Sequence, residues 1–386
     1  MRVGLFVGSW DPQINGVVTS VKELQAGLTQ LGVESIIITG GDVKEPTQNG
    51  NVVLLPRKEL KKWNNNFVNY FSKKNIDFIS NLGLDIIHSH QENSIGFLAS
   101  KIAKLNNLPH VITWHTCYQD YKHYILYNAF FVETILEKYC ARKYCGKKVQ
   151  AVITPSTKLS DHLTKDLKIY HKPYIIKTGI HINPNRINRS GALELRDKLG
   201  FTQDDFVISY IGRIAKEKNI GFLLEAQIAL SSLDEHIKLL IVGDGPYLEK
   251  LKKYTDKLGV SDNVVFAGRV EREDLDPYYQ ASDINVNSSI TESQGVTVLE
   301  ALQNGVPVCC INDSAFDYVI KEGYNGARFS SMQDYIQKIL QLKNSNLDEM
   351  RKNALRSGNE YNNIRYAKEI LDIYTKCLEQ SNKKIH

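Results

Sequence analysis

Residues 284–302 read INVNSSITESQGVTVLEAL, and they join a short strand, a polar loop and a helix. The β-branched residues Ile284 and Val286 favour a strand over 284–287. Apolar residues recur at helical spacing after the loop, which predicts a helix over 293–303. A strand that passes through a loop into a helix is the repeating unit of a parallel α/β sheet.

The same unit recurs on both sides of this stretch. In the second half of the chain we predict strands over 206–211, 238–242, 263–266 and 306–311, and helices over 220–230, 247–258 and 275–281. In the first half we predict a helix over 17–31 and strands over 3–7, 35–39, 52–55, 86–88, 110–113 and 151–154. This alternation indicates parallel sheets with helices on both faces. The fold class is therefore α/β, with two Rossmann-like, doubly wound domains that face each other across a cleft.

Length and composition agree with two globular domains. The chain has 386 residues, 42% hydrophobic and 24% charged, which excludes a disordered or collagenous protein. We place an N-terminal domain at 1–180, a C-terminal domain at 181–360, and a final helix at 361–386 that packs back onto the first domain. Ligands of doubly wound sheets bind beyond the carboxyl ends of the strands, so the loops at those ends are the candidate sites.

Two cationic residues follow the strand at 206–211. Arg213 and Lys218 lie in the loop GRIAKEKN, which begins at Gly212. A planar guanidinium and a compact ammonium within reach of one anion suit a diphosphate. An ordinary basic turn would explain the same residues, so this loop alone does not decide the function.

Weaker candidates follow the next two strands. Gly243 comes after 238–242, and a glycine there would let the backbone approach a ligand closely. Arg269 and Val270 come after 263–266, where backbone groups could contact a nucleotide base. Turn chemistry explains these residues equally well.

The loop after 284–287 carries the strongest candidates. Glu292 lies in the loop, and Glu300 comes eight residues later on the helix, where an unpaired acid among apolar residues would be costly. Backbone N–H groups at the start of a helix suit a phosphate. The residues that would supply this end are Ser293, Gln294, Gly295 and Val296.

The first domain offers two further candidates. Gly16 stands where the loop after 3–7 enters a helix, which repeats the logic of an anion site at a helix N-terminus. His115 follows the strand at 110–113. A lone histidine is more often structural, but one at a strand end that faces a cleft is a candidate for chemistry.

Taken together, these residues resemble the retaining glycosyltransferases of family 4, which have the GT-B fold. Glu292 and Glu300 match the Glu-x7-Glu signature of the family, and Arg213 and Lys218 match its diphosphate-binding pair. Gly16 matches its N-terminal glycine-rich loop, and His115 matches its histidine. The resemblance covers nearly the whole chain, and the stretches 5–21 and 114–124 are most similar to bacterial diacylglycerol α-glucosyltransferases.

The resemblance implies transfer of a hexose to a membrane lipid such as diacylglycerol, with retention of configuration. The expected donor is UDP-glucose, which would supply glucose. It implies a nucleotide-binding C-terminal domain, an acceptor-binding N-terminal domain, and no cofactor or metal. The pair Asp274 and Asp276 is interpreted as a helix cap. The chain departs from the family at His181, where an aspartate is common, and this affects the expected hinge.

The positive charge is concentrated in the first half. Residues 1–180 carry a net charge of +8 and residues 181–386 carry −3. Residues 57–74 contain six basic residues and one acid, and their aromatic residues recur at helical spacing. We therefore predict an amphipathic helix that binds an anionic membrane surface. The candidate membrane or acceptor residues, which include two tyrosines of the basic and aromatic stretch 118–148, are Lys58, Lys61, Lys62, Trp63, Phe67, Tyr70, Phe71, Tyr118 and Tyr121.

The expected location is the cytoplasm, with peripheral attachment to the inner face of the cell membrane. We find no signal peptide, no membrane span, no zinc-type cysteine spacing and no nucleic-acid module, and the sequence leaves the oligomeric state open. Three alternatives remain: the aromatic residues of 57–74 belong to a core, the acceptor is a polysaccharide, teichoic acid or protein, or the chain is a nucleotide-sugar-binding regulator rather than an enzyme.

Overall fold

A computed structural model describes residues 1–8, 10, 15–60, 65–116, 130–183, 186–289 and 291–382. The chain divides into two compact units. Unit 1 comprises Met1–His181 and Asn362–His386, and unit 2 comprises Ile182–Tyr361. These bounds lie within two residues of those that the sequence predicts.

The sheet of unit 1 has the strand order β3-β4-β2-β1-β6-β7-β8-β9, with β5 paired to β4. The pairs β3–β4 and β4–β5 are antiparallel, and the others are parallel. Its strands are β1 (Arg2–Phe6), β2 (Glu34–Gly41), β3 (Thr47–Asn49), β4 (Val52–Leu60), β5 (Asn65–Val68), β6 (Ile86–Ser89), β7 (His110–Thr113), β8 (Ala151–Thr154) and β9 (Tyr174–Ile175).

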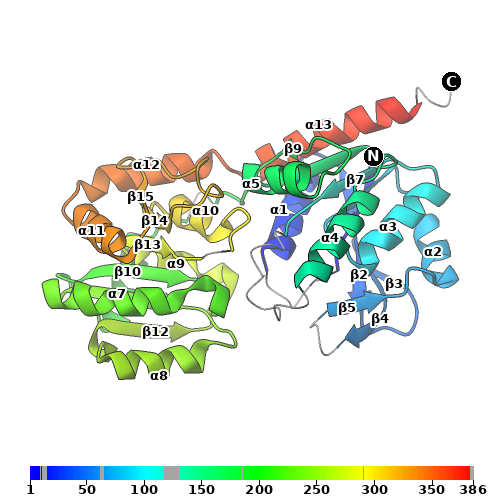
Figure 1. The fold of residues 1–386 in the computed structure, drawn as a ribbon. Coiled ribbons are helices and arrows are strands. Elements are labelled where there is room, and N and C mark those ends of the chain that lie inside the picture. The colour runs from blue at the N-terminus through cyan, green and yellow to red at the C-terminus, as the bar shows by residue number, and fades with distance from the viewer. Residues whose placement is uncertain are drawn as a thin grey trace. The chain divides into compact units, whose positions relative to one another are not determined.

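The C-terminal helix belongs to unit 1, where it packs along the first helix (Figure 1). Val21 and Leu24 of the first helix share one buried cluster with Leu5 of β1 and with Ile370 and Tyr374 of the last. Burial of this apolar face ties residues more than 340 positions apart into one core. The helices of unit 1 are α1 (Gly16–Gln30), α2 (Lys73–Ser80), α3 (Ser94–Leu105), α4 (Phe130–Tyr144), α5 (Thr157–Asp161) and α13 (Asn363–Asn382), with a π-helical turn at His162–Asp166.

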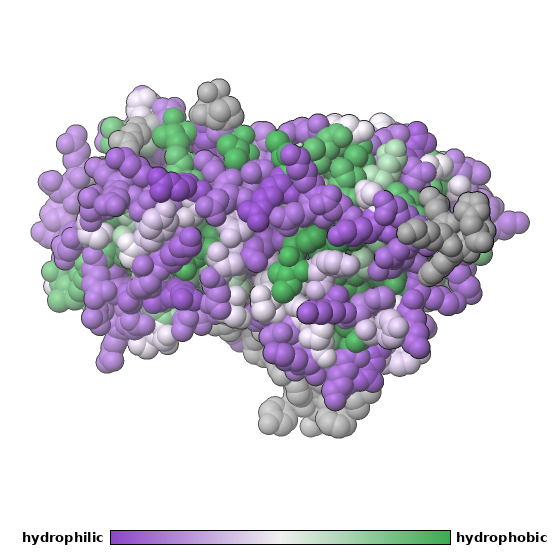
Figure 2. Space-filling model, turned by 90° about the horizontal axis from the view of Figure 1, so that it is seen from above, coloured by the Kyte–Doolittle hydropathy of each residue, from purple (hydrophilic) through white to green (hydrophobic). Residues whose placement is uncertain are grey.

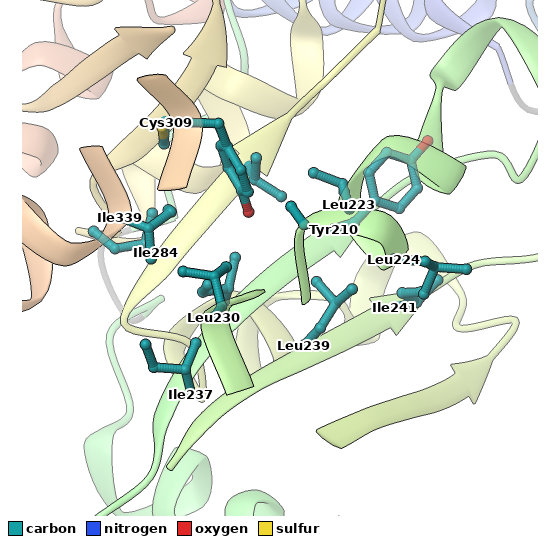
Figure 3. Close-up of a cluster of buried hydrophobic side chains, with 14 of the residues drawn as sticks. Tyr210, Leu223, Leu224, Leu230, Ile237, Leu239, Ile241, Ile284, Cys309 and Ile339 are labelled. Atoms are coloured by element: carbon teal, nitrogen blue, oxygen red, sulfur yellow. The ribbon is translucent and has the colours of Figure 1, made fainter. Parts of the chain in front are cut away.

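Unit 2 has a parallel sheet in the order β12-β11-β10-β13-β14-β15. Its central strands and helices bury one cluster that includes Leu224, Leu239, Ile241 and Ile284 (Figure 3). The strands are β10 (Phe206–Ile211), β11 (Ile237–Val242), β12 (Val264–Gly268), β13 (Ile284–Asn287), β14 (Val308–Ile311) and β15 (Gly326–Phe329). The helices are α6 (Arg189–Lys198), α7 (Ile220–Leu233), α8 (Leu248–Leu258), α9 (Asp276–Gln280), α10 (Val296–Gln303), α11 (Met332–Lys343) and α12 (Leu347–Asn359).

The interpretation of residues 57–74 as one amphipathic helix is wrong. Residues 57–60 continue β4, and β5 returns antiparallel to it, with Lys58 opposite Phe67. The reason is local: β4 is already extended where it pairs with β2 as far as Pro56, and three consecutive asparagines at 64–66 are poor helix formers. A helix begins only at Lys73, after the cap residue Ser72. Lys61, Lys62 and Trp63 lie outside the described residues.

Candidate active site

Three glycine-containing loops of unit 2 meet at the carboxyl ends of β10, β11 and β12. The Gly212 N–H donates to the Val242 carbonyl at 3.0 Å, and the Gly243 N–H donates to the Gly268 carbonyl at 2.8 Å. Gly243 has φ 138°, and a Cβ there would lie 2.0 Å from the Gly212 carbonyl oxygen. Only glycine fits, so this edge of the sheet presents closely packed backbone.

The two predicted phosphate-binding cations lie in the loop after β10. Lys218 Nζ donates to Glu292 Oε1 at 2.6 Å, while the Arg213 guanidinium pairs with the buried Glu217. The Arg213 side chain is 56% exposed and the Lys218 side chain 23%. The structure thus joins Lys218 to Glu292, as expected for one site, but also assigns Arg213 a carboxylate partner that the sequence analysis missed.

Sheet order explains why Lys218 and Glu292 meet. β10 and β13 are neighbours, so the loops after them share one edge. The hydroxyl of Ser288, which follows β13, donates to the carbonyls of Lys218 at 3.0 Å and Asn219 at 3.3 Å. These bonds hold the 3-10 turn Lys216–Lys218 against the loop that carries Glu292.

The helix after this loop begins three residues later than predicted. α10 starts at Val296 because Gly295, with φ 76°, turns the chain into it, and Ser293 and Gln294 belong to the loop. A Cβ on Gly295 would lie 2.5 Å from the Phe316 ring. The turn therefore requires glycine for two reasons: there is no room for a side chain, and the positive φ disfavours other residues. The first N–H groups of the helix therefore lie just after Gly295, and that of Val298 already donates to the Gly295 carbonyl at 3.0 Å.

Glu300 lies on α10 between two partners that sequence reasoning did not identify. Tyr279 Oη donates to Glu300 Oε2 at 3.0 Å, and Arg272 Nη2 lies 3.2 Å from Glu300 Oε1. Burial, with a further contribution from the Glu300 carboxylate, raises the pKa of Tyr279 well above its usual value, so the phenol remains a donor. No sequence signal distinguishes Tyr279 or Arg272 from an ordinary surface residue.

The remaining donor-site candidates of unit 2 differ in burial. Arg269 is largely exposed and pairs with Glu271 at 3.0 Å, and Val270 is half-buried. The buried Gln294 accepts a hydrogen bond on its backbone carbonyl from Tyr318 Oη at 3.3 Å. These contacts leave the loop backbone as the feature most suited to a ligand.

The start of α1 differs from the anion site that was expected at Gly16. Asn15 caps the helix, and its side-chain oxygen accepts from the N–H groups of Val17 and Val18, both at 3.0 Å. Two of the free donors of this helix end are thus already paired. Gly16 itself is exposed, and a Cβ there would meet nothing within 4 Å.

His115 is buried at the end of β7, and another histidine lies beside it. His115 Nε2 is 3.2 Å from Nδ1 of His90, which follows β6. Burial lowers the pKa of His115 to about 4, so the ring is neutral at pH 7. His90 was missed, although the pattern His88-Ser89-His90 at a strand end was a readable signal.

The predicted hinge and cap residues have structural partners. The His181 N–H donates to Glu23 Oε2 at 2.8 Å, which ties the last residue before unit 2 to α1. Asp276 opens α9 and lies 3.2 Å from Arg186 Nε. Within the ranges that the structure describes, no group of three or more His, Cys, Asp or Glu could hold a metal ion.

Of the aromatic residues predicted to bind a membrane, Phe67 and Phe71 are exposed on unit 1, whereas Tyr70 is half-buried and packs against a hydrophobic core cluster. The Tyr70 ring lies 4.3 Å from that of Phe71, and Lys101 Nζ lies 4.8 Å from the centre of the Phe71 ring. Phe71 is 68% exposed, Phe67 38%, and Lys58 is also exposed. Tyr118 and Tyr121 lie outside the described residues. On the face that Figure 2 shows, hydrophobic residues form separate patches among hydrophilic ones. Among the helices that the structure describes, none has the length and apolarity to cross a membrane.

Both units are similar to parts of known proteins. The model of Glycosyltransferase Family 4 matches residues 14–183, and that of glycosyl transferases group 1 matches 192–360. Alpha-monoglucosyldiacylglycerol synthase of Acholeplasma laidlawii is 33% identical, with 100% of each chain covered. The Streptococcus pneumoniae protein of the same name is 32% identical, covering 88% of this chain and 78% of that one. Anabaena HepE, solved in complex with UDP and glucose, has a TM-score of 0.78 at 15% identity, covering 97% and 100%. The fold is GT-B, and the chain belongs to glycosyltransferase family 4.

Proposed function

We propose that this glycosyltransferase transfers a hexose, glucose from UDP-glucose, to diacylglycerol and so makes a membrane glycolipid. The observation that carries the proposal is the meeting of Lys218 and Glu292 at the carboxyl edge of β10 and β13, with Arg213 in the same loop. Support for the acceptor comes from the similarity to two alpha-monoglucosyldiacylglycerol synthases, one of which matches over the full length of both chains.

In the proposed reaction the protein's own cations stabilise the leaving nucleoside diphosphate. Negative charge grows on the diphosphate as the bond to the sugar breaks, and Arg213, Lys218 and the N–H groups after Gly295 would bind it. Cations and oriented dipoles of this kind do without a metal ion, so we propose none. Binding of the diphosphate would draw Lys218 away from Glu292 and leave that carboxylate to hold hydroxyl groups of the sugar.

The other residues divide between recognition and the reacting sugar. Glu300, held by Tyr279 and Arg272, would accept hydrogen bonds from the ribose. His115 would bind the sugar as a neutral ring and support the positive charge that develops on it. We propose retention of configuration, with departure and attack on the same face of the sugar, rather than a covalent intermediate on Glu292.

The acceptor is proposed to reach the protein from an anionic membrane surface. Unit 1 contains 27 Lys+Arg and 17 Asp+Glu, a net charge of +10, whereas unit 2 contains 21 and 26, a net charge of −5. Basic residues near an anionic surface contribute about 1 kcal/mol each to attachment. The exposed Phe71 beside Lys101 adds an apolar group that the interface accommodates.

Mass spectrometry of the products tests the proposed reaction. The full-length protein is incubated with a panel of UDP- and GDP-sugars and with vesicles that contain diacylglycerol, with or without anionic lipid. We expect monoglucosyldiacylglycerol from UDP-glucose, with the α configuration by NMR. Transfer to a soluble glycan at the same rate without vesicles would refute the lipid acceptor.

A matched pair of variants tests the membrane surface. Phe71→Ser removes an aromatic group of unit 1 that is 68% exposed, and Leu193→Ser removes a leucine of unit 2 that is 59% exposed. We expect weaker sedimentation with anionic vesicles for Phe71→Ser and no change for Leu193→Ser. Equal binding by both variants would show that Phe71 is not part of the attachment surface.

A further inference from the structure

Three buried histidines of unit 1 lie in a row at the carboxyl ends of β6 and β7. His88 and His90 are two residues apart, so their side chains extend to the same face of the sheet. His115 lies at the end of β7, the neighbour of β6. His88 and His90 are fully buried, and His115 is 9% exposed. The rings of His88 and His90 are 4.1 Å apart, and those of His90 and His115 are 5.5 Å apart.

His88 is the fixed end of this row. Its Nδ1 is 2.6 Å from Tyr374 Oη on α13, and its Nε2 is 2.7 Å from Thr113 Oγ1 on β7. Both nitrogens therefore have partners on different elements, which fixes the ring. His90 packs against this ring at an interplanar angle of 36°, and its Nδ1 contacts Nε2 of His115 at 3.2 Å.

We propose that His90 is a positioning residue, which fixes the ring orientation and the tautomer of His115 through the contact between its Nδ1 and Nε2 of His115. This inference rests on the proposed role of His115 in binding the transferred sugar. The sheet and α13 would thus hold His88 in place, His88 would hold the ring of His90, and His90 would hold the ring of His115.

The hydrogen-bond inventory indicates which tautomer is fixed. Burial lowers the pKa of both rings, so both are neutral at pH 7 and one proton lies between them. His90 Nε2 is buried and has no hydrogen-bond partner among the described residues. A buried N–H without a partner is rarer than a buried acceptor without one. The proton of His90 therefore belongs on Nδ1, where it donates to His115, and His115 carries its own proton on Nδ1.

This tautomer gives His115 a defined chemical role. Its Nε2 is occupied as an acceptor, and its Nδ1–H remains as a donor toward a hydroxyl oxygen of the sugar. Reversal of the proton would convert the same nitrogen into an acceptor, so the wrong tautomer would lose the hydrogen bond without any movement of the backbone.

Nitrogen NMR of the protein labelled with 15N-histidine tests the proposal without substrate. The His115 signals are assigned by their loss in His115→Gln. In the unmodified chain we expect the Nδ1–H form of His115, and in His90→Phe we expect a mixture of both neutral forms. An Nε2–H form in the unmodified chain, or unchanged signals in His90→Phe, would overturn the proposal.

Rescue and control variants separate positioning from simple folding. Asparagine places a polar atom near the Nδ1 position of histidine, and glutamine places one near Nε2. We expect kcat/KM to fall about 10–100-fold in His90→Phe and His90→Gln, and to recover in His90→Asn. The control is His110→Asn, because His110 is also buried but bonds to Ser89 Oγ at 2.7 Å. It should leave both kcat/KM and the His115 signals unchanged.

The two readouts distinguish the two proposals. If UDP-glucose and diacylglycerol fail as substrates while the His115 tautomer behaves as expected, the proposed substrates are wrong and the positioning stands. If transfer proceeds but His90→Phe retains full kcat/KM, His90 does not position His115.

Discussion

Replacing Lys218 by methionine removes the ammonium that we place on the leaving diphosphate, while it keeps the length of the side chain. Lys218 Nζ lies 2.6 Å from Glu292 Oε1, and the side chain is 23% exposed. Two unit charges 4 Å apart interact by about 4 kcal/mol near a protein surface. Loss of one preorganised donor in comparable sites costs about 2.7–4 kcal/mol of transition-state stabilisation. We therefore expect kcat to fall by a factor of about 100 to 1000.

The effect should fall on kcat more than on the Michaelis constant for the donor. To bind the diphosphate in the ground state, the Lys218 ammonium must leave the Glu292 carboxylate. Loss of that ion pair offsets part of the energy that Lys218 gains by binding the diphosphate. In the transition state the charge on the diphosphate has grown, so the same cation contributes more. The assay is initial-rate formation of glycolipid from a radiolabelled nucleotide sugar, with donor concentration varied on vesicles of fixed composition.

Lys216→Met is the matched control. Lys216 is exposed in the same 3-10 turn, two residues earlier, so its replacement changes the net charge and the turn composition equally. We expect normal kcat for this variant. A Lys218→Met enzyme that keeps a third of normal kcat, or an equal loss in Lys216→Met, would refute the role of Lys218 at the diphosphate.

Two further predictions concern stability. His162 contacts Glu137 at 2.9 Å, and although burial lowers its pKa, its carboxylate partners raise it above the ordinary value. The ion pairs of His162 then stabilise the folded protein below about pH 6.5, and this stabilisation is lost as pH rises through the raised pKa of His162. Urea unfolding should show His162→Gln less stable by about 2 kcal/mol at pH 6 and by less at pH 9; an equal deficit at both would contradict this. Gly295→Ala should lower Tm more than Gly323→Ala, because both glycines have positive φ but only at Gly295 would a Cβ meet a side chain, that of Phe316; calorimetry with equal shifts would count against the clash.

Much of the fold could be predicted because strand and helix periods are local properties of the sequence. The strands at 110–113, 151–154, 206–211 and 284–287 have the predicted bounds. The position of Lys218 and Glu292 at one edge of a sheet also follows, since loops at the carboxyl ends of parallel strands share that edge. Which loops are neighbours depends on the order of the strands in the sheet. The alternation of strands and helices along the sequence does not reveal that order.

The predictions were wrong or incomplete where contacts between distant parts of the sequence determine the local structure or the partner of a side chain. Aromatic residues at helical spacing in 57–74 are also compatible with two antiparallel strands, and pairing of β4 with β2 selected the strands. The partners Glu217 and Arg272 are ordinary charged residues in sequence, and only packing places them beside Arg213 and Glu300. Gly295 was identified as part of a helix start, but its φ of 76° moved that start by three residues.

The division of charge between the units becomes informative once the distances over which charges act are considered. Unit 2 is acidic overall, yet in our proposal it binds the anionic donor. This is consistent, because the Debye length is about 8 Å at physiological ionic strength and distant carboxylates are largely screened. We propose that contacts within hydrogen-bond distance, those of Arg213 and Lys218, then decide donor binding. A membrane presents its charge over a whole surface, so the excess of unit 1 acts collectively there. In our proposal, net charge therefore bears on the acceptor side of the reaction, whereas individual residues determine the donor side.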